Sequence, residues 1–329
     1  MQTLTEAPPG RRFLPLDADR SRFLGASDVA AVLGLSKWKT PLATYLQKRG
    51  EAPETPTSPV MEWGNRLEDA VRTAYFDKVL GSTNFRVLPG EAIGRVVAPE
   101  VDWMVCSPDG IVVDSDDQWL YGLECKTADR AVAHLWGDSG TDQVPDAYAL
   151  QCHYSMYVTG LDRWDVAVLI GGNDFRTYTL RRSDELLNLI LPDLAAFWLR
   201  VETGTPPEPV AADNPLMAKL FQQRVDDMIE GDETINRLAT ALASAKEVLA
   251  TDQEQVDELE AKLKAVIGEK AGAVGPWGKI SWKQNRASEV VDWKAVARDA
   301  GATEVQIAAH TSVRSGARPF RVTFTGGAS

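Results

Sequence analysis

The sequence predicts an α/β fold of the α+β kind, with a central mixed sheet flanked by helices. Residues 164–170 (WDVAVLI) form a near-continuous apolar run, which is typical of a strand buried on both faces. Residues 61–79 repeat apolar side chains at helical spacing, and residues 184–202 form a second long amphipathic helix. Further strands are expected over residues 92–98, 103–106, 110–113, 119–126 and 177–180.

Composition fits a globular protein with one large domain or two. The chain has 329 residues, of which 44% are hydrophobic and 25% charged. No run of about 18 apolar residues exists, so no membrane span is expected, and the N-terminal stretch lacks the apolar core of a signal peptide. The three cysteines form no CxxC pair, which argues against a zinc ribbon or an iron–sulfur cluster and favours a reducing compartment.

Charge is distributed unevenly along the chain. Residues 1–50 and 271–329 each carry a net charge of +4, whereas residues 51–270 carry −20, giving −12 in total. An acidic centre suits a cation site, and the basic ends are candidate phosphate-contacting surfaces. The alternative is that these are ordinary solvated faces.

The N-terminal region contains a candidate phosphate site. Residues 1–19 are expected to be a loose arm, followed by a helix for which Ser27 or Asp28 is the natural N-cap. Helix N-termini bind phosphate through unpaired N–H groups, so Arg20 and Ser27 are candidate phosphate ligands. A plain N-cap serine beside a surface arginine remains open. Likewise, the segment Lys37-Trp38-Lys39 fits either nucleic-acid contact or a buried tryptophan between exposed lysines.

Two predicted helices carry polar residues that could face a site. Glu68 lies at the edge of the apolar face of the helix over residues 61–79, where local sequence alone favours an ordinary surface glutamate. The helix over residues 145–157 carries Gln151 and Tyr154.

The main chemical motif is a predicted strand pair joined by a polar turn. The first strand ends at Asp109 in the run CSPDG, and the second contains Glu124-x-Lys126. Residues two apart in a strand point to the same face, so the Glu124 carboxylate and the Lys126 ammonium should lie together. Two carboxylates hold Mg²⁺, and a lysine beside them suits metal-assisted phosphodiester hydrolysis.

The C-terminal part is predicted to be separate. A linker after residue 205 leads to a helical segment over residues 211–269, in which apolar residues from Ile235 to Val266 keep a heptad spacing that only Asp252 interrupts. One long helix is favoured over two, although Thr251 and Glu254 also fit a capping box. It could pack on the preceding helix (Leu216, Leu220, Val225, Ile229) or on a partner chain. Residues 273–329 are expected to form a small basic α+β tail, with strands at 278–283 and 319–324 and a helix at 291–300.

The order of these motifs resembles the PD-(D/E)xK nucleases, and within them the YqaJ-type viral recombinase and phage lambda exonuclease family. The resemblance spans residues 20–205. The matching motifs are Gly25-Ala26-Ser27-Asp28, Trp63-Gly64-Asn65-Arg66-Leu67-Glu68, Cys106-Ser107-Pro108-Asp109-Gly110, Leu123-Glu124-Cys125-Lys126 and the stretch from Gln151 through Tyr154 to Gly160.

The resemblance implies roles for individual residues. Asp109, Glu124 and the backbone carbonyl of Cys125 would hold Mg²⁺, for which Mn²⁺ can substitute, and Lys126 would position or activate the attacking water. Glu68 and Gln151 would support the site, with Glu68 available to a second metal. Arg20 and Ser27 would bind the 5′-phosphate of a DNA end, with Arg22 as a rival for Arg20.

The resemblance also implies a function. It predicts a 5′-to-3′ exonuclease that digests one strand of duplex DNA and leaves a 3′ single strand for an annealing protein of the same phage or prophage. A trimeric ring and a location in the bacterial cytoplasm are implied as well. The alternatives are another PD-(D/E)xK nuclease of different polarity and a non-catalytic DNA-end-binding or scaffold protein.

Overall fold

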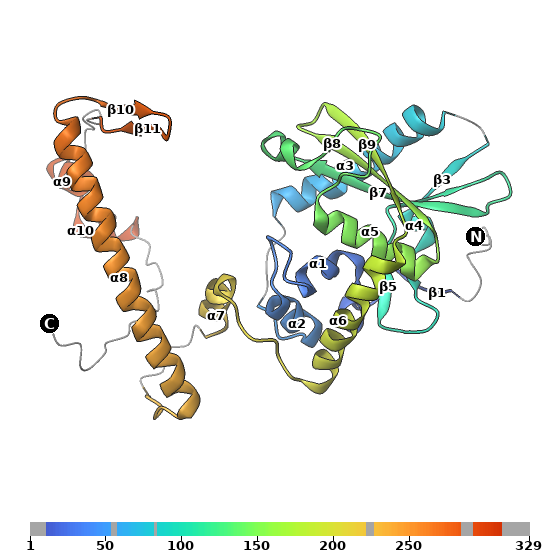
Figure 1. The fold of residues 1–329 in the computed structure, drawn as a ribbon, viewed down its shortest axis with the longest axis horizontal. Coiled ribbons are helices and arrows are strands. Elements are labelled where there is room, and N and C mark those ends of the chain that lie inside the picture. Colours follow the sequence, from blue (N-terminus) through green and yellow to red (C-terminus); the bar gives the residue numbers. More distant parts are fainter. Residues whose placement is uncertain (1–10, 54–57, 82–83, 222–226, 284–291, 311–329) are drawn as a thin grey trace. The chain divides into compact units, whose positions relative to one another are not determined.

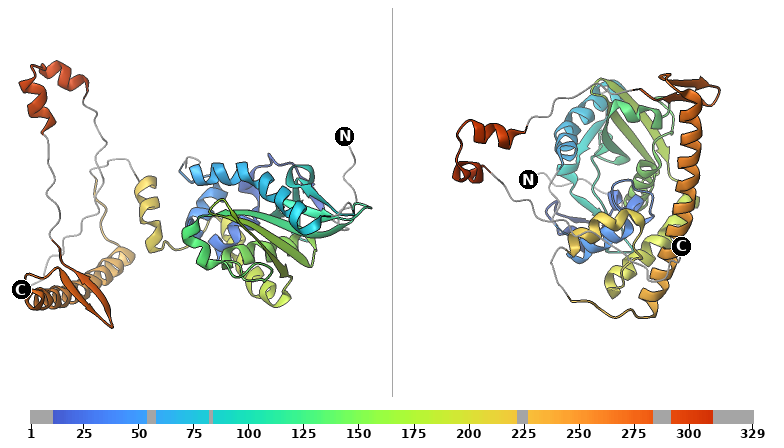
Figure 2. Two further views of the ribbon diagram at one scale, coloured as in Figure 1. Left: turned by 90° about the horizontal axis from the view of Figure 1, so that it is seen from above. Right: turned by 90° about the vertical axis from the view of Figure 1, so that its left-hand side faces the viewer.

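The computed structural model describes residues 11–53, 58–81, 84–221, 227–283 and 292–310. These residues divide into two compact units, residues 1–222 and 223–329. Figures 1 and 2 show the first unit as a sheet structure covered by helices and the second as one long helix with small appended elements. None of the described helices combines the length and apolar character needed to cross a membrane.

A five-stranded mixed sheet forms the centre of the first unit, as predicted. Its strand order is β3-β6-β7-β8-β9, with β7 and β8 parallel and the other neighbours antiparallel. The strands are β3 (Arg86–Pro89), β6 (Gly110–Val113), β7 (Trp119–Ala128), β8 (Arg163–Ile170) and β9 (Asp174–Arg181). The predicted strand over residues 164–170 is therefore confirmed, with Trp164, Val166 and Val168 fully buried.

A second, four-stranded sheet has the order β1-β4-β5-β2. Its strands are β1 (Arg12–Leu14), β2 (Leu24–Gly25), β4 (Arg95–Val97) and β5 (Met104–Cys106). Two expectations change here. Arg12–Leu14 is not part of a loose arm, because it pairs with β4. The strand expected over residues 92–98 starts at Arg95, because Gly90–Ile93 forms the short helix α4.

Helices cover both faces of the central sheet. On one face α3 (Pro59–Tyr75) packs Val71 and Tyr75 against Leu123 and Cys125. On the other face α5 (Asp146–Thr159) and α6 (Asp184–Thr203) form the main core with alternate residues of β8. Besides α4, the other described α-helices of this unit are α1 (Val29–Val32), α2 (Pro41–Arg49) and α7 (Asn214–Leu220).

Local sequence explains the start and end of α2. The Thr40 hydroxyl accepts a hydrogen bond from the Ala43 N–H at 3.0 Å, and Pro41 occupies the first turn, where a missing N–H costs nothing. Gly50 ends the helix with a φ of 71°, a left-handed conformation that glycine adopts without a steric penalty.

The first unit extends past the linker expected after residue 205. Leu216 and Leu220 of α7 pack against the main core, and the buried Asp213 carboxylate accepts a hydrogen bond from the Thr40 hydroxyl at 2.5 Å. These contacts place residues 211–220 in the first unit, and not with the heptad helix in one segment over residues 211–269 as expected.

The second unit is built on α8 (Glu233–Ile267), a single uninterrupted helix, as the heptad register predicted. The Thr251 hydroxyl donates to the Glu247 carbonyl within α8 and caps nothing. The other elements are β10 (Gly272–Gly275), β11 (Gly278–Ser281), α9 (Trp293–Asp299) and α10 (Glu304–Ala309). The strand expected over residues 319–324 lies outside the described residues.

Candidate active site

The candidate site lies where β6 and β7 meet. Glu124 and Lys126 share one face of β7, as predicted, since the Lys126 ammonium is hydrogen-bonded to the Glu124 carboxylate. Asp109 does not end a strand as expected, because β5 stops at Cys106. It lies in the connection between the two sheets, directly before β6, and its Oδ2 accepts the Cys125 N–H at 2.7 Å. The site therefore depends on how the two sheets join.

Helix α5 contributes an amide to this cluster. Gln151 Nε2 donates to Glu124 Oε1 at 2.5 Å, the same oxygen that accepts from Lys126. Tyr148, one turn earlier on α5, places its ring 5.3 Å from the Lys126 ammonium. Sequence reasoning missed Tyr148, which its three-residue spacing from Gln151 could have indicated.

Tyr154 does not face the cluster. Its hydroxyl donates to the Leu24 carbonyl at 2.7 Å and accepts the Val105 N–H at 3.1 Å. The fully buried Tyr154 thus joins α5 to β2 and β5 of the second sheet.

Glu68 approaches the cluster from α3 through an arginine. Arg72 Nη1 lies 3.3 Å from Glu68 Oε1 and donates to the Asp109 backbone carbonyl at 3.0 Å. Its Nη2 is paired with Asp69 Oδ1 at 2.9 Å. Arg72 was not singled out from the sequence, although its four-residue spacing from Glu68 is that of a helical ion pair. It holds the Asp109 segment and the Glu68 side chain together.

Burial and mutual repulsion raise the pKa values of carboxyl groups in the site. Burial and the Asp109 carboxylate raise the pKa of Glu124 to about 7. Burial and Asp109 also raise the pKa of Glu68 to about 7. Burial acts to lower the pKa of Lys126, but the Glu124 and Asp109 carboxylates outweigh it and raise that pKa, so the ammonium stays charged. The site concentrates negative charge around one cation.

This donor set fits a hard divalent cation. The Asp109 and Glu124 carboxylates lie close enough to interact, and burial raises the pKa of both groups. Two buried carboxylates side by side are suitable ligands for such a cation. Among the described residues, no three His, Cys, Asp or Glu side chains converge into a ready-made cluster. A cation here would therefore need the Cys125 carbonyl or water in addition to the two carboxylates.

The predicted phosphate ligands also come together. Arg20 Nη2 lies 3.4 Å from the Ser27 hydroxyl, and both residues are exposed. Asp28 is the N-cap residue of α1, one of the two predicted positions, although its side chain makes no capping hydrogen bond to that helix. The Asp28 carboxylate instead accepts the Gly25 N–H at 3.2 Å within a 3₁₀ turn, Ala26–Asp28.

The segment between α1 and α2 resolves one open alternative. Trp38 is not buried, because 94% of its surface is exposed. The Ser36 hydroxyl accepts the N–H groups of Trp38 and Lys39, so the indole projects from a fixed turn. Of the two alternatives, contact with nucleic acid is the one that this exposure permits.

Comparison with known proteins shows a family resemblance in the first unit. Residues 17–162 match the model of the YqaJ-like viral recombinase domain. The chain is 28% identical over 254 residues to the uncharacterized protein YqaJ of Bacillus subtilis strain 168, covering 75% of this chain and 73% of that protein.

Two solved structures are more distant. The alkaline exonuclease LHK-Exo of Laribacter hongkongensis is 19% identical, with a TM-score of 0.42 over 57% of this chain and 92% of that one. A phage related exonuclease of Haemophilus somnus 129PT is 10% identical, with a TM-score of 0.37 over 55% and 94% of the two chains. The range that the family model matches contains Arg20, Ser27, Glu68, Asp109, Glu124, Lys126 and Gln151. Residues 17–162 of this chain are therefore similar to the YqaJ-like viral recombinase domain.

Proposed function

We propose that this chain, a DNA nuclease, is a divalent-metal-dependent exonuclease that digests the 5′-ended strand of linear duplex DNA. The observation that carries the proposal is the convergence of Asp109, Glu124 and Lys126 at one end of β6 and β7, with Gln151 bound to Glu124. The product would be a duplex with a 3′ single-stranded end, the substrate of a single-strand annealing protein from the same phage or prophage. The site of action would be the bacterial cytoplasm.

Asp109, Glu124 and the Cys125 carbonyl would hold the cation, with Mg²⁺ as the expected ion and Mn²⁺ as a substitute. When bound, the cation supplies Lewis-acid stabilisation of negative charge on the scissile phosphate. Glu68 would stand near a second ion or support the first through Arg72.

The chain's own residues define the rest of the chemistry. Without a bound cation, the Glu124 and Asp109 carboxylates raise the pKa of Lys126 and keep its ammonium charged, so that it can orient the attacking water and stabilise negative charge on the phosphate. Gln151 fixes the Glu124 carboxylate, because its amide and the Lys126 ammonium share Oε1. Arg72 fixes the backbone at Asp109.

Arg20 and Ser27 would receive the terminal 5′-phosphate. Their side chains meet at an exposed position, and a guanidinium with a hydroxyl supplies several hydrogen-bond donors to phosphate oxygens. An exonuclease that starts at a 5′ end can use such a site to hold the terminal phosphate, so the proposed polarity depends on it. A ring of three copies would keep the enzyme on its substrate.

The deciding experiment is a time course with Mg²⁺ on linear duplexes labelled separately at the 5′ and 3′ ends, with a circular duplex as control. The expected result is early release of the 5′ label, late loss of the 3′ label and an intact circle. Asp109→Ala and Lys126→Ala should abolish release. Undiminished digestion by both variants would contradict the assigned site, early 3′ release would reverse the polarity, and end binding without cleavage would favour a scaffold role.

A further inference from the structure

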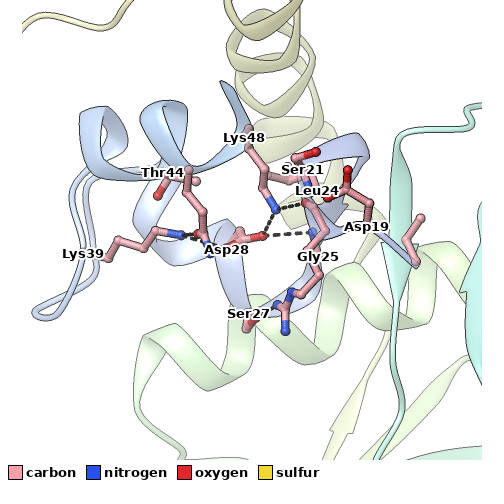
Figure 3. A network of polar contacts seen from close by, with 12 residues as sticks. Asp19, Ser21, Leu24, Gly25, Ser27, Asp28, Lys39, Thr44 and Lys48 are labelled. Atoms are coloured by element: carbon pink, nitrogen blue, oxygen red, sulfur yellow. Dashed lines mark hydrogen bonds and ion pairs between the residues drawn. The ribbon is translucent and has the colours of Figure 1, made fainter. Parts of the chain in front are cut away.

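Asp28 is a buried carboxylate directly next to the proposed phosphate ligand Ser27. Only 5% of its surface is exposed. Its Oδ2 lies 2.7 Å from the Lys48 ammonium and accepts the Gly25 N–H, and its Oδ1 lies 3.1 Å from the Lys39 ammonium (Figure 3). Asp28 thus connects three segments that are separate in the sequence.

Lys48 links this carboxylate to the other proposed phosphate ligand. Its side chain is 1% exposed, and its ammonium also donates to the Arg20 backbone carbonyl at 2.9 Å. One buried ammonium therefore holds the backbone of Arg20, while the Asp28 carboxylate bound to it holds the backbone of Gly25. The Arg20 guanidinium and the Ser27 hydroxyl lie 3.4 Å apart, and the chain segments that carry them are both bound to this ion pair.

Stability alone does not explain a buried ion pair. Desolvation of two charges offsets most of their attraction, and well-packed apolar residues in the same place are often as stabilising or more so. What the pair supplies is a fixed geometry, since each charge must keep its partner. Burial acts to raise the pKa of Asp28, but Lys48 and Lys39 outweigh it and lower the pKa to about 2, which keeps the carboxylate ionised.

We propose that Asp28 and Lys48 are positioning residues that set the distance between the Arg20 guanidinium and the Ser27 hydroxyl and so determine the preference for a 5′-phosphorylated end. This inference rests on the proposed function, since it concerns how the same phosphate site is built. Neither residue touches the phosphate in this scheme. Their effect should appear in discrimination between DNA ends and not in the hydrolysis step.

The test compares kcat and KM on two otherwise identical duplexes, one with a 5′-phosphate and one with a 5′-hydroxyl. Variants are Asp28→Asn, Lys48→Met, the double variant Asp28→Asn/Lys48→Met and Ser27→Ala. Asp165→Asn is the matched control, because Asp165 is also buried and ion-paired, with Arg163 at 2.6 Å, but lies on β8. Thermal unfolding is measured for every variant.

The expected result is that Asp28→Asn and Lys48→Met lower the phosphate preference on the order of 10-fold, the scale of one charge-assisted hydrogen bond, mainly through KM. The double variant should regain thermal stability, because no unpaired buried charge remains, and yet keep the low preference. Asp165→Asn should lose stability and keep the wild-type preference.

Two results would overturn the inference. If the double variant recovers phosphate preference together with stability, the pair is only structural. If Asp28→Asn keeps the preference while Ser27→Ala loses it, the phosphate site of the proposed function stands without these positioning residues. A wild-type enzyme that treats both ends equally would overturn the phosphate site itself, and the inference with it.

Discussion

The Asp109 carboxylate, directly before β6, accepts a 2.7 Å hydrogen bond from the N–H of Cys125 in β7. The N–H and C=O of one strand residue point to the same side of the strand. The Cys125 carbonyl therefore faces the same edge as Asp109. This relationship gives a physical basis for the proposal that the carbonyl of Cys125 joins Asp109 and Glu124 around a cation.

The first prediction separates the charge of Asp109 from its hydrogen bond. Asp109→Asn keeps an oxygen for the Cys125 N–H but removes one of two facing carboxylates. Cleavage should fall on the order of 100-fold or more, while thermal stability without divalent cations should stay the same or rise. The checks are a cleavage assay and a melting curve in EDTA. Loss of activity together with a large loss of stability would show that Asp109 acts mainly in folding.

The second prediction concerns pH. Because the pKa of Glu124 is raised to about 7 from 4.5, the folded state binds more protons than the unfolded state between these values. The stabilisation is complete below about pH 4.5 and is lost as the pH rises through about 7. In EDTA, the free energy of unfolding should fall more between about pH 5 and pH 8 in the wild type than in Glu124→Gln.

The same pKa governs the response to metal. Protons and a divalent cation compete for the Glu124 carboxylate, so Mg²⁺ should stabilise the protein more at about pH 8 than at about pH 5. Urea unfolding with and without Mg²⁺ measures this difference. Equal stabilisation at both pH values would place the cation away from Glu124.

The third prediction distinguishes two exposed arginines of one 3₁₀ turn, Arg20–Arg22. Arg20 contacts Ser27, and no contact between Arg22 and Ser27 is present in the described structure. Arg20→Ala should therefore reduce the preference for a 5′-phosphate on the order of 10-fold, and Arg22→Ala should reduce it much less. Competition between phosphorylated and hydroxyl-ended duplexes measures the ratio. A larger effect of Arg22→Ala would exchange their roles.

Sequence reasoning succeeded where the relevant geometry is local. The same-face placement of Glu124 and Lys126 follows from strand periodicity, and the single helix α8 follows from its heptad register. It failed where the structure of a residue depends on contacts with segments far away in the sequence. Asp28 was predicted as a possible N-cap residue, but its ion pairs were not predicted, because its partners Lys39 and Lys48 come from later segments. Strands of two to four residues, such as β1, β2 and β3, are too short to show the alternation of apolar and polar residues that predicts a strand. They form because they pair with neighbouring strands.

The fourth prediction tests the link between α5 and the second sheet. Tyr154→Phe leaves the Leu24 carbonyl and the Val105 N–H without the hydroxyl that each contacts. The expected loss is about 1–3 kcal/mol in the free energy of unfolding, because both groups are buried. Tyr157→Phe, one turn further along α5, keeps both bonds and should cost less. Equal losses would show that the two hydrogen bonds of the Tyr154 hydroxyl add no more stability than the Tyr157 hydroxyl does.

The last prediction concerns the second unit. All residues of the three buried apolar clusters lie in the first unit, as do all the candidate site residues. A chain ending at Gln222 should therefore fold and keep metal-dependent cleavage of short duplexes with the same preference for phosphorylated ends. Any loss should be confined to long duplexes, where the basic residues of the tail could contribute to DNA retention. Circular dichroism and digestion of short and long duplexes provide the comparison. An unfolded or inactive product would show that the second unit completes the core or the site.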